Sequence, residues 1–492
     1  MNADLALGVD VGTTTIKAAV FELPDAATPL ALAQEHAPTA TPRPGWFETD
    51  PRLVLEIAVR CIRRAVGQVD AARVRALGIS GTASGAWLVD GEGQPVGPAI
   101  LWNDGRAADT VSRWGRDDTL ARVFDISGNV LYPGYTLPVL GWLRDHEPER
   151  LAAAAKVLCC KDWLRCGLTG ELLTDETDAA YVPCDIRNRA WSPALLALCG
   201  VEELVRLLPD IAPPRHTSPL VPAVADATGL PPGLPVALGA TDIIAGIVGA
   251  GAVAPGHAVT ILGTSAVSTV VTEAPLFEPR LIGIMATSPL GRWTRSLVNT
   301  AGSMTLDWTA GLITAGDVGA LIQKAEVAAP GAGGLVFLPY LSPAGVVSPF
   351  VDPLARGVLA GLRVDQRPED VARATVEGLA FAVADCYAHM PVPVVEVTAI
   401  GGAARSDLLL QTIADATGAA IHRPAGAEFG ARGVALLAAW ATGAWETDAE
   451  LEEAARAVGR EHTFTPVPYT TSEALARYRA TTQATRELWA RW

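Results

Sequence analysis

Two short segments, far apart in the chain, contain the residue types that can hold phosphate. The first is 10–15, Asp-Val-Gly-Thr-Thr-Thr, and the second is 261–265, Ile-Leu-Gly-Thr-Ser. Each lies between apolar runs and predicts two strands joined by a turn whose N–H groups and hydroxyls can bind an anion. Alignment places Gly12 with Gly263 and Asp10 with Ile261. Only the first turn therefore has a carboxylate that could reach a metal ion.

A single hairpin of this kind is usually only a turn, because short motifs often match by chance. The duplication instead favours a nucleoside triphosphate held between two related domains. The candidate nucleotide-binding residues in and beside the two turns are Asp10, Gly12, Thr13, Thr14, Lys17, Gly263, Thr264 and Ser265. Asp10 is also the candidate metal ligand.

Asp242 is the candidate catalytic base. It follows the apolar run 236–241, and open α/β sheets place their sites at the carboxyl ends of strands. A hydroxyl that accepts a phosphoryl group needs a carboxylate within hydrogen-bond reach to take its proton. The alternative is that Asp242 caps the helix expected over 243–250, a common role for aspartate.

Two further segments have site-like compositions. Gly401, Gly402 and Ala403, with Ser406 after them, follow the apolar run 394–400 and predict either an adenosine contact or an ordinary strand-to-helix turn. The segment 101–106 joins an aromatic ring, an amide, an acid and a guanidinium. This mixture suits a sugar, with Trp102, Asn103 and Asp104 as candidate contacts, or a surface loop with one Asp–Arg pair.

Strand-like and helical runs alternate along the 492 residues, which predicts an α/β fold with two or three domains. The helical period over 51–66, with Pro51 in its first turn and Asp50 as N-cap, is the clearest example. Further helices are expected over 368–389, 406–417 and 472–492. We place the domain boundary near 252–256, which gives domains 1–252 and 253–492.

The bulk composition limits the classes of partner. A net charge of −15 argues against a surface that coats nucleic acid, and the apolar stretches are too short to span a membrane. No signal peptide pattern precedes the first strand, and the seven cysteines lack disulfide or metal spacing. These features predict a cytoplasmic protein with reduced cysteines.

With these pieces placed, the chain resembles the FGGY family of carbohydrate kinases over almost its whole length. The segments that carry the resemblance are 357–362 with 370–377, 337–342, and 401–406. The resemblance implies two actin-like ATPase domains with ribonuclease-H-like cores around a hinged cleft. It also implies ATP and Mg²⁺, with Asp242 as base, Asp10 on the metal side and both turns on phosphates. Homodimers are common in the family.

Within the family, the segment 99–106 is most similar to the xylulokinase group, which predicts a ketopentose phosphorylated on a terminal hydroxyl. Thr82, Ala83 and Ser84 stand where that group has Gln, Met and His, so we expect a preferred substrate other than D-xylulose. The family's Glu-Arg loop is replaced at 343–349, and the stretch 160–164 is also similar to L-xylulose and erythritol kinases. The alternatives are therefore a kinase of a sugar alcohol such as erythritol, or a sugar or nucleotide sensor without turnover.

Overall fold

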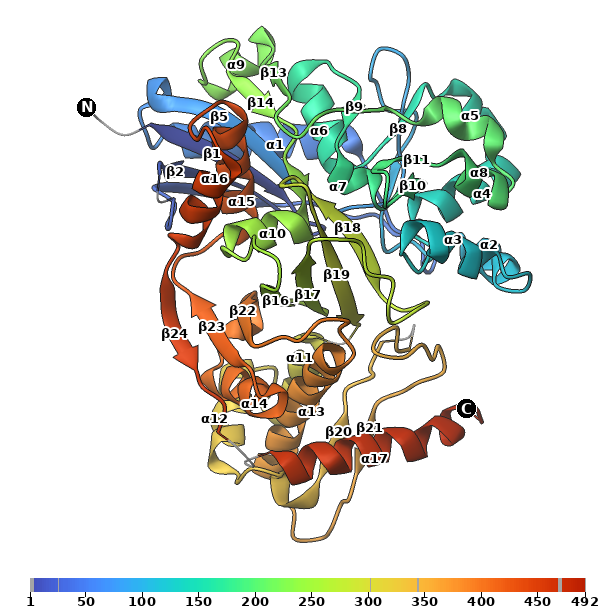
Figure 1. Cartoon of the computed structure of the whole chain (residues 1–492), viewed down its shortest axis with the longest axis vertical. Helices are drawn as coiled ribbons and strands as arrows, with labels where there is room; N and C mark the ends of the chain where they lie inside the picture. Colours follow the sequence, from blue (N-terminus) through green and yellow to red (C-terminus); the bar gives the residue numbers. More distant parts are fainter. Residues whose placement is uncertain (1–3, 25, 301, 343–344, 468–470, 492) are drawn as a thin grey trace.

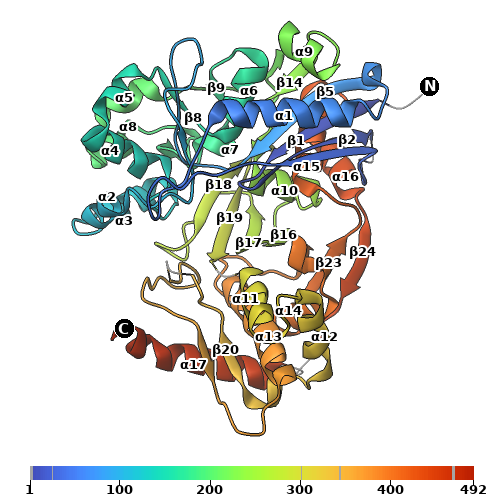
Figure 2. The same cartoon turned by 180° about the vertical axis from the view of Figure 1, so that it is seen from behind.

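The computed structural model describes residues 4–24, 26–300, 302–342, 345–467 and 471–491. Over these residues, two sheets of seven strands lie one above the other along the long axis of the molecule (Figures 1 and 2). The first sheet has the order β13 (Thr217–Pro219), β14 (Pro235–Ala237), β5 (Val74–Gly81), β1 (Leu5–Val11), β2 (Thr15–Glu22) and β3 (Ala31–His36), and β15 (Ala240–Thr241) also pairs with β5.

The second sheet repeats the central arrangement of the first. Its order is β18 (Ile284–Ser288), β19 (Arg292–Asn299), β17 (Ala266–Thr272), β16 (Ala258–Leu262), β22 (Glu396–Ile400), β23 (Ala420–Pro424) and β24 (Arg460–Phe464). In both sheets an antiparallel hairpin, β1–β2 or β16–β17, pairs in parallel with a strand from later in the chain, β5 or β22. The two hairpins predicted from the sequence are thus confirmed, and they occupy equivalent places.

Local sequence signals account for the helices that cover the sheets. Helix α1 (Pro51–Val66) begins after Asp50, whose carboxylate accepts a hydrogen bond from the Arg52 N–H at 2.9 Å, as expected of its N-cap. Its apolar side is buried against β2 and β3. On the second sheet, α13 (Pro368–Ala388) and α14 (Asp407–Thr417) pack against the strands, and α11 (Met304–Ile313) and α12 (Val318–Val327) pack against α13.

The single strand expected over 236–242 is instead two short strands, β14 and β15. Gly239 separates them with a φ of 77°, and a Cβ atom there would lie 1.7 Å from the Ile79 carbonyl oxygen. This left-handed backbone interrupts the ladder and redirects the chain toward α10 (Asp242–Gly249).

A helix from the second half of the chain packs on the first sheet. Helix α15 (Phe429–Ala441) follows the second sheet in sequence but packs on β1 and β5 of the first and against α10 (Figure 1). Glycines permit this contact: a Cβ at Gly8 would lie 1.9 Å from the Ala431 carbonyl oxygen, and one at Gly433 would lie 1.9 Å from the Ala245 oxygen. Helix α16 (Asp448–Arg456) packs against α15. The boundary in sequence therefore does not coincide with the packing layers.

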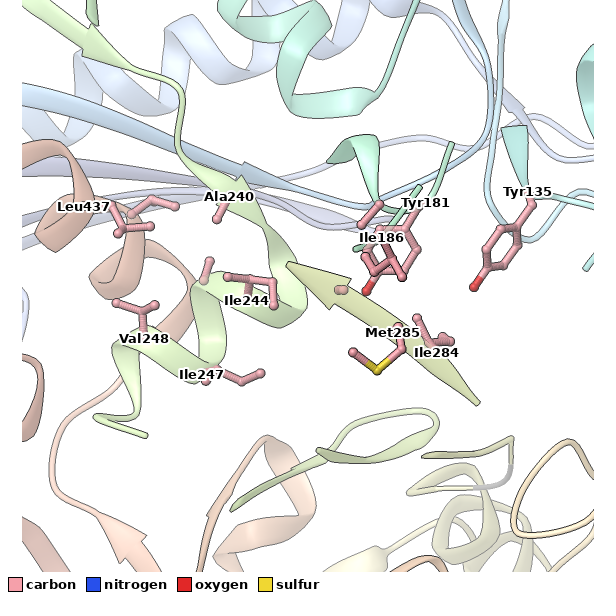
Figure 3. Close-up of a cluster of buried hydrophobic side chains, with 14 of the residues drawn as sticks. Tyr135, Tyr181, Ile186, Ala240, Ile244, Ile247, Val248, Ile284, Met285 and Leu437 are labelled. Atoms are coloured by element: carbon pink, nitrogen blue, oxygen red, sulfur yellow. The ribbon is translucent and has the colours of Figure 1, made fainter. Parts of the chain in front are cut away.

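A buried hydrophobic cluster joins the halves beside α10. Ile244 and Ile247 of α10 lie near Ile284 and Met285 of β18, and Tyr181 faces them (Figure 3). Tyr181 belongs to the long segment of chain between β5 and β14. The helices and strands of this segment include β6 (Trp87–Val89), β7 (Ala99–Ile100), α2 (Ala108–Trp114), α3 (Thr119–Ser127), α4 (Thr136–His146), α5 (Pro148–Ala153), β8 (Lys156–Leu158), α6 (Cys160–Thr169), β9 (Leu173–Thr174), α7 (Glu176–Ala179), α8 (Pro193–Leu198) and α9 (Pro222–Thr228).

The last helix, α17 (Ser472–Trp489), packs on β20 (Val336–Leu338), which pairs with β21 (Val358–Ala360). It therefore closes the end of the molecule farthest from the first sheet (Figure 1). Among the described residues, no helix has the length and apolar character needed to cross a membrane.

Candidate active site

Asp10 lies at the end of β1, at the edge where the strands of the first sheet meet α15. Its Oδ1 accepts a hydrogen bond from the Ser80 hydroxyl of β5 at 2.5 Å. Burial raises the pKa of Asp10, although Ser80 and then Lys17 act in the opposite direction. A Cβ at Gly430, in the first turn of α15, would lie 2.8 Å from Oδ2. The start of α15 is therefore packed directly against this carboxylate.

Asp242 is the first residue of α10, and Thr241 occupies the N-cap position. The Asp242 Oδ1 atom accepts a hydrogen bond from the Ile243 N–H at 2.8 Å. Burial raises the pKa of Asp242 to about 7, and the negative charge of Asp10 contributes to the increase. The candidate base and the candidate metal ligand are thus close enough to repel each other. A carboxylate with such a pKa can exchange protons near neutral pH.

The two Gly-Thr turns are braced differently. In the first, the Gly12 N–H donates to the Thr15 carbonyl oxygen at 3.0 Å, within the turn itself. In the second, the Thr264 and Gly263 carbonyls accept hydrogen bonds from the N–H groups of Gly302 and Ser303, just before α11, at 2.9 and 2.7 Å. Thr264 is exposed, as is Thr14 of the first turn, so both turns present hydroxyls to solvent.

Lys17 lies opposite Asp10 in the β1–β2 ladder. Its ammonium is 2.7 Å from the carboxylate of Glu428, which is the residue immediately before α15. Lys17 therefore links the first hairpin to α15 in this structure.

Trp102 connects the predicted sugar-binding segment with the first predicted phosphate-binding turn. Its indole N–H donates to the Thr13 hydroxyl at 3.0 Å, and 48% of Trp102 is exposed. The neighbouring Asn103 has a buried Oδ1 atom that accepts no hydrogen bond from the described residues. Because an unsatisfied buried acceptor is costly, this oxygen is a suitable partner for a ligand hydroxyl.

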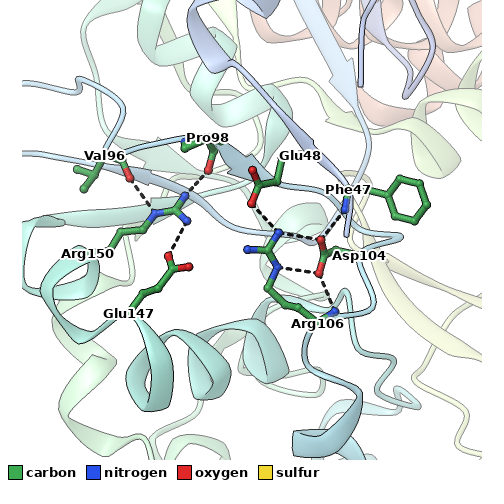
Figure 4. A network of polar contacts seen from close by, with 8 residues as sticks. All are labelled: Phe47, Glu48, Val96, Pro98, Asp104, Arg106, Glu147 and Arg150. Carbon is green, nitrogen blue, oxygen red and sulfur yellow. Dashed lines mark hydrogen bonds and ion pairs between the residues drawn. The ribbon is translucent and has the colours of Figure 1, made fainter. Parts of the chain in front are cut away.

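Asp104 differs from its two neighbours because protein donors occupy both of its oxygens (Figure 4). It accepts from the Phe47 N–H at 2.6 Å and from the Arg106 side chain at 2.8 and 2.9 Å. Arg106 also pairs with Glu48 at 2.7 Å and stacks on Trp46. The Asp–Arg pair, which was the alternative to sugar binding for this segment, is thus present but buried, and it braces the loop that carries Trp102 and Asn103.

Thr82, Ala83 and Ser84 follow β5, next to the end of β1. The Thr82 N–H donates to the Val11 carbonyl oxygen at 3.3 Å, and Ser84 is buried with a φ of 67°. These three residues therefore lie at the same sheet edge as Asp10 and its partner Ser80.

The Gly401 turn lies beside the second hairpin, because β22 pairs in parallel with β16. Gly401 has a φ of 98°, and a Cβ there would lie 2.6 Å from the Leu262 carbonyl oxygen. Gly401 and Gly402 are exposed, whereas Ala403 is buried. The Ser406 hydroxyl accepts from the Leu409 N–H at 3.2 Å and caps α14. The exposed glycines offer an open backbone surface next to the second turn.

Two tyrosines, Tyr132 and Tyr181, were not among the residues predicted from the sequence. Tyr132 and Tyr181 have buried hydroxyls with no hydrogen-bond partner among the described residues, and Tyr135 lies between their rings, 5.5 and 6.2 Å away. Burial raises the pKa of Tyr181, and the charge of Asp242 adds to this effect. No spacing rule identifies Tyr181, because tertiary packing alone brings it near Asp242.

Comparison with known protein families accounts for the two related halves of the chain. The models of the FGGY family of carbohydrate kinases match the chain over 5–249 for the N-terminal domain and 258–442 for the C-terminal domain. The chain belongs to the FGGY family of carbohydrate kinases. It therefore has the two-domain actin-like ATPase fold and is an ATP-dependent sugar phosphotransferase.

Individual FGGY kinases are similar over most of their length. The xylulose kinase of Escherichia coli is 36% identical over 443 residues, which cover 88% of this chain and 89% of that protein. The erythritol kinase of Brucella abortus is 30% identical over 464 residues, with 90% and 88% covered. The crystal structure of a xyloylose kinase from Brucella ovis has a TM-score of 0.89 at 29% identity and covers 98% of this chain and 100% of that one.

Proposed function

We propose that this kinase transfers the γ-phosphoryl group of ATP to a terminal hydroxyl of a ketopentose, with Asp242 as the base. The observation that carries the proposal is the position of Asp242 at the start of α10, close enough to Asp10 for the two charges to repel each other, where burial and this repulsion raise its pKa to about 7. The xylulose kinase relatives support a ketopentose.

The residues around Asp10 fit a divalent cation. Asp10 and Asp242 are two carboxylates whose negative charges oppose each other, and a bound cation would relieve this repulsion. Oxygen donors are the ligands that Mg²⁺ prefers. Magnesium-bound ATP would supply the transferable phosphoryl group, with its charge partly neutralised. We assign Asp10 to the metal side and Gly12, Thr13, Thr14, Gly263, Thr264 and Ser265 to the phosphates.

We assign proton transfer, phosphate binding and adenosine binding to residues of the chain itself. Asp242 accepts the proton of the substrate hydroxyl, while the backbone N–H groups and hydroxyls of the two turns hold the phosphates in line with it. Gly401, Gly402 and Ala403 provide a surface for the adenosine. Because the turns belong to different sheets, nucleotide binding requires both halves at once.

We assign substrate binding to Thr82, Ala83, Ser84, Trp102 and Asn103, together with Asp242. Trp102 offers an apolar ring face and Asn103 offers an unsatisfied acceptor, a combination that suits a polyhydroxy compound. The small side chains at 82–84 favour a ketopentose other than D-xylulose. The erythritol kinase relative makes a sugar alcohol the second candidate.

A substrate panel tests this proposal. ADP release is measured with ATP and, separately, D-xylulose, L-xylulose, other pentuloses, erythritol, glycerol and gluconate. We expect a pentulose other than D-xylulose to give the highest kcat/KM. A large preference for D-xylulose would contradict the pocket argument, and a preference for a polyol would establish the second candidate. Substrate binding without ADP release in every case would indicate a sensor.

A further inference from the structure

We propose that a buried relay from Lys161 through Asp175 and Thr177 to the backbone N–H of Thr241 positions Asp242 for proton transfer. Lys161, Asp175 and Thr177 would thus be positioning residues, which touch neither substrate nor nucleotide. This inference rests on the proposed role of Asp242 as the base.

The relay begins at a lysine that is fully buried among three carboxylates. The Lys161 ammonium lies 2.6 Å from Asp162, 2.8 Å from Asp175 and 3.0 Å from Asp178. Burial raises the pKa of Asp178 well above its ordinary value; the charge of Lys161 acts in the opposite direction, and the neighbouring carboxylates add to the increase. A buried charge is stabilised by ion pairs and hydrogen bonds. Lys161 donates a hydrogen bond to Asp162, and Asp175 accepts one from the Asp178 N–H at 3.1 Å, whereas the Asp178 carboxylate accepts none from the described residues and is held only by its ion pair with Lys161. These contacts fix Asp175, the member that continues the relay.

Two hydrogen bonds connect the cluster to the candidate base. The Thr177 hydroxyl donates to Asp175 Oδ2 at 2.7 Å and accepts from the Thr241 N–H at 3.0 Å. Thr177 and Thr241 are both fully buried. Thr241 is the N-cap residue of α10, and Asp242 is the next residue. The relay therefore fixes the backbone from which the Asp242 side chain projects.

A metal site is the competing interpretation of the same cluster. The Cys159 sulfur and carboxylate oxygens of Asp162 and Asp178 lie within 4.8 Å of one another. However, the Lys161 ammonium is within 3.0 Å of both carboxylates and already supplies the positive charge. The cluster is thus an internal ion network whose cation belongs to the chain.

The network is also packed under the substrate loop. A Cβ at Gly81, the residue before Thr82, would lie 3.0 Å from the Lys161 backbone nitrogen. The start of α6, which carries Lys161, therefore supports both the loop at 82–84 and, through Thr177, the start of α10. A displacement of either by a fraction of an ångström is expected to affect catalysis.

The test replaces the Thr177 hydroxyl and compares it with a matched hydroxyl of the same network. Thr177→Val removes both hydrogen bonds, while Thr177→Ser retains the hydroxyl. Thr174→Val is the control, because the buried Thr174 hydroxyl donates to Asp162 at 2.6 Å, rather than to Asp175, and makes no direct hydrogen bond with Thr241. For each variant kcat, both KM values and Tm are measured, and the folded fraction is determined by ADP titration.

We expect Thr177→Val to lower kcat about 10- to 100-fold while the KM for Mg-ATP changes less than twofold. Thr177→Ser should retain kcat within about threefold. Thr174→Val should lower Tm by a similar amount but keep kcat within about threefold. A purely stabilising role for Thr177 would instead change Tm and the folded fraction but not the kcat of the folded enzyme, and this outcome would overturn the inference.

A double-variant cycle separates this inference from the proposed function. In the Asp242→Asn background, Thr177→Val should cause no further loss of the residual turnover, because the base that it positions is already absent. If Asp242→Asn itself retains turnover, the role of Asp242 fails. If Asp242→Asn strongly lowers turnover but Thr177→Val has no effect, or lowers kcat by the same factor in both backgrounds, only the relay fails.

Discussion

The two sheets have the same central strands but different chemistry at equivalent positions. In the first sheet Asp10 of β1 lies opposite Ser80 of β5, whereas in the second sheet Ile261 of β16 lies opposite Ile400 of β22. The turn that follows each strand keeps its glycine and hydroxyls. The backbone geometry that holds phosphate is thus present twice, while the charge needed beside a cation is present once.

Two helices extend this comparison. Helix α15 faces Asp10 through Gly430, and α10 faces Ile261 and Ile400 through Gly246. Each helix begins beside an acid, Glu428 for α15 and Asp242 for α10. Glu428 is paired with Lys17 at 2.7 Å, whereas Asp242 has no ion pair with a cationic side chain among the described residues. Asp242, which lacks a cationic partner, has a pKa of about 7, which is the property a base requires.

The largest expected effect is at this unpaired acid. Asp242→Asn should lower kcat by about 10²–10⁴-fold and leave binding of substrate and ADP nearly unchanged, because it removes the base but preserves size. Glu428→Gln should cause a much smaller loss. In the wild type, kcat/KM for the substrate should fall as the pH decreases through about 7, since Asp242 must be deprotonated to act. A variant with near wild-type turnover would contradict the assignment.

The next effect distinguishes the two strand ends. Asp10→Asn should lower turnover and change its dependence on Mg²⁺, because the carboxylate on the metal side is lost. Ile261→Val, at the equivalent position of the second sheet, should leave the Mg²⁺ dependence unchanged. Turnover is measured at saturating substrate over a range of Mg²⁺ concentrations with ATP held constant. Equal shifts in both variants would show that the two strand ends do not differ as proposed.

A smaller effect is expected where the two copies are alike. Thr13→Val and Thr264→Val should each weaken Mg-ATP binding, because each loses a charge-assisted hydrogen bond worth about 1.5–3 kcal/mol, or roughly ten- to a hundredfold. Since both contact one ligand, the double variant should depart from additivity. Mg-ATP titrations of the single and double variants measure this. If Thr264→Val has no effect on the titration, the second turn is not part of the nucleotide site.

The parts of the site that could be predicted from sequence are those encoded locally. The Gly-Thr turns, the Asp50 cap and the periodic face of α1 each depend on residues within a few positions of one another. The placement of α15 on β1 and β5 depends instead on glycines from distant segments. For the same reason the bracing role of Asp104, the position of Tyr181 near Asp242 and the hydrogen bonds of the proposed Thr177 relay became visible only in the folded chain.

The smallest effect concerns stability, and it again separates the two acids. An unfolded aspartate has a pKa of about 3.9 and folded Asp242 has one of about 7, so the native state binds more protons between these values. Stability from this group therefore falls as the pH rises from about 4 to 7, and the cost is constant above 7.

Asp242→Asn removes that cost and should raise the free energy of unfolding by about 1–3 kcal/mol at pH 8, less than the full pKa difference implies because the side chain is partly accessible. At pH 5 the gain should shrink to about a third of this value, since most of the titration lies above that pH.

Glu428→Gln breaks a partly exposed ion pair and should lower stability by about 1 kcal/mol or less at either pH. Tm measurements on all three proteins at pH 5 and pH 8 test these signs. A lower Tm of Asp242→Asn than of the wild type at pH 8 would mean that Asp242 is stabilised by its surroundings, and it would remove the physical basis for its raised pKa.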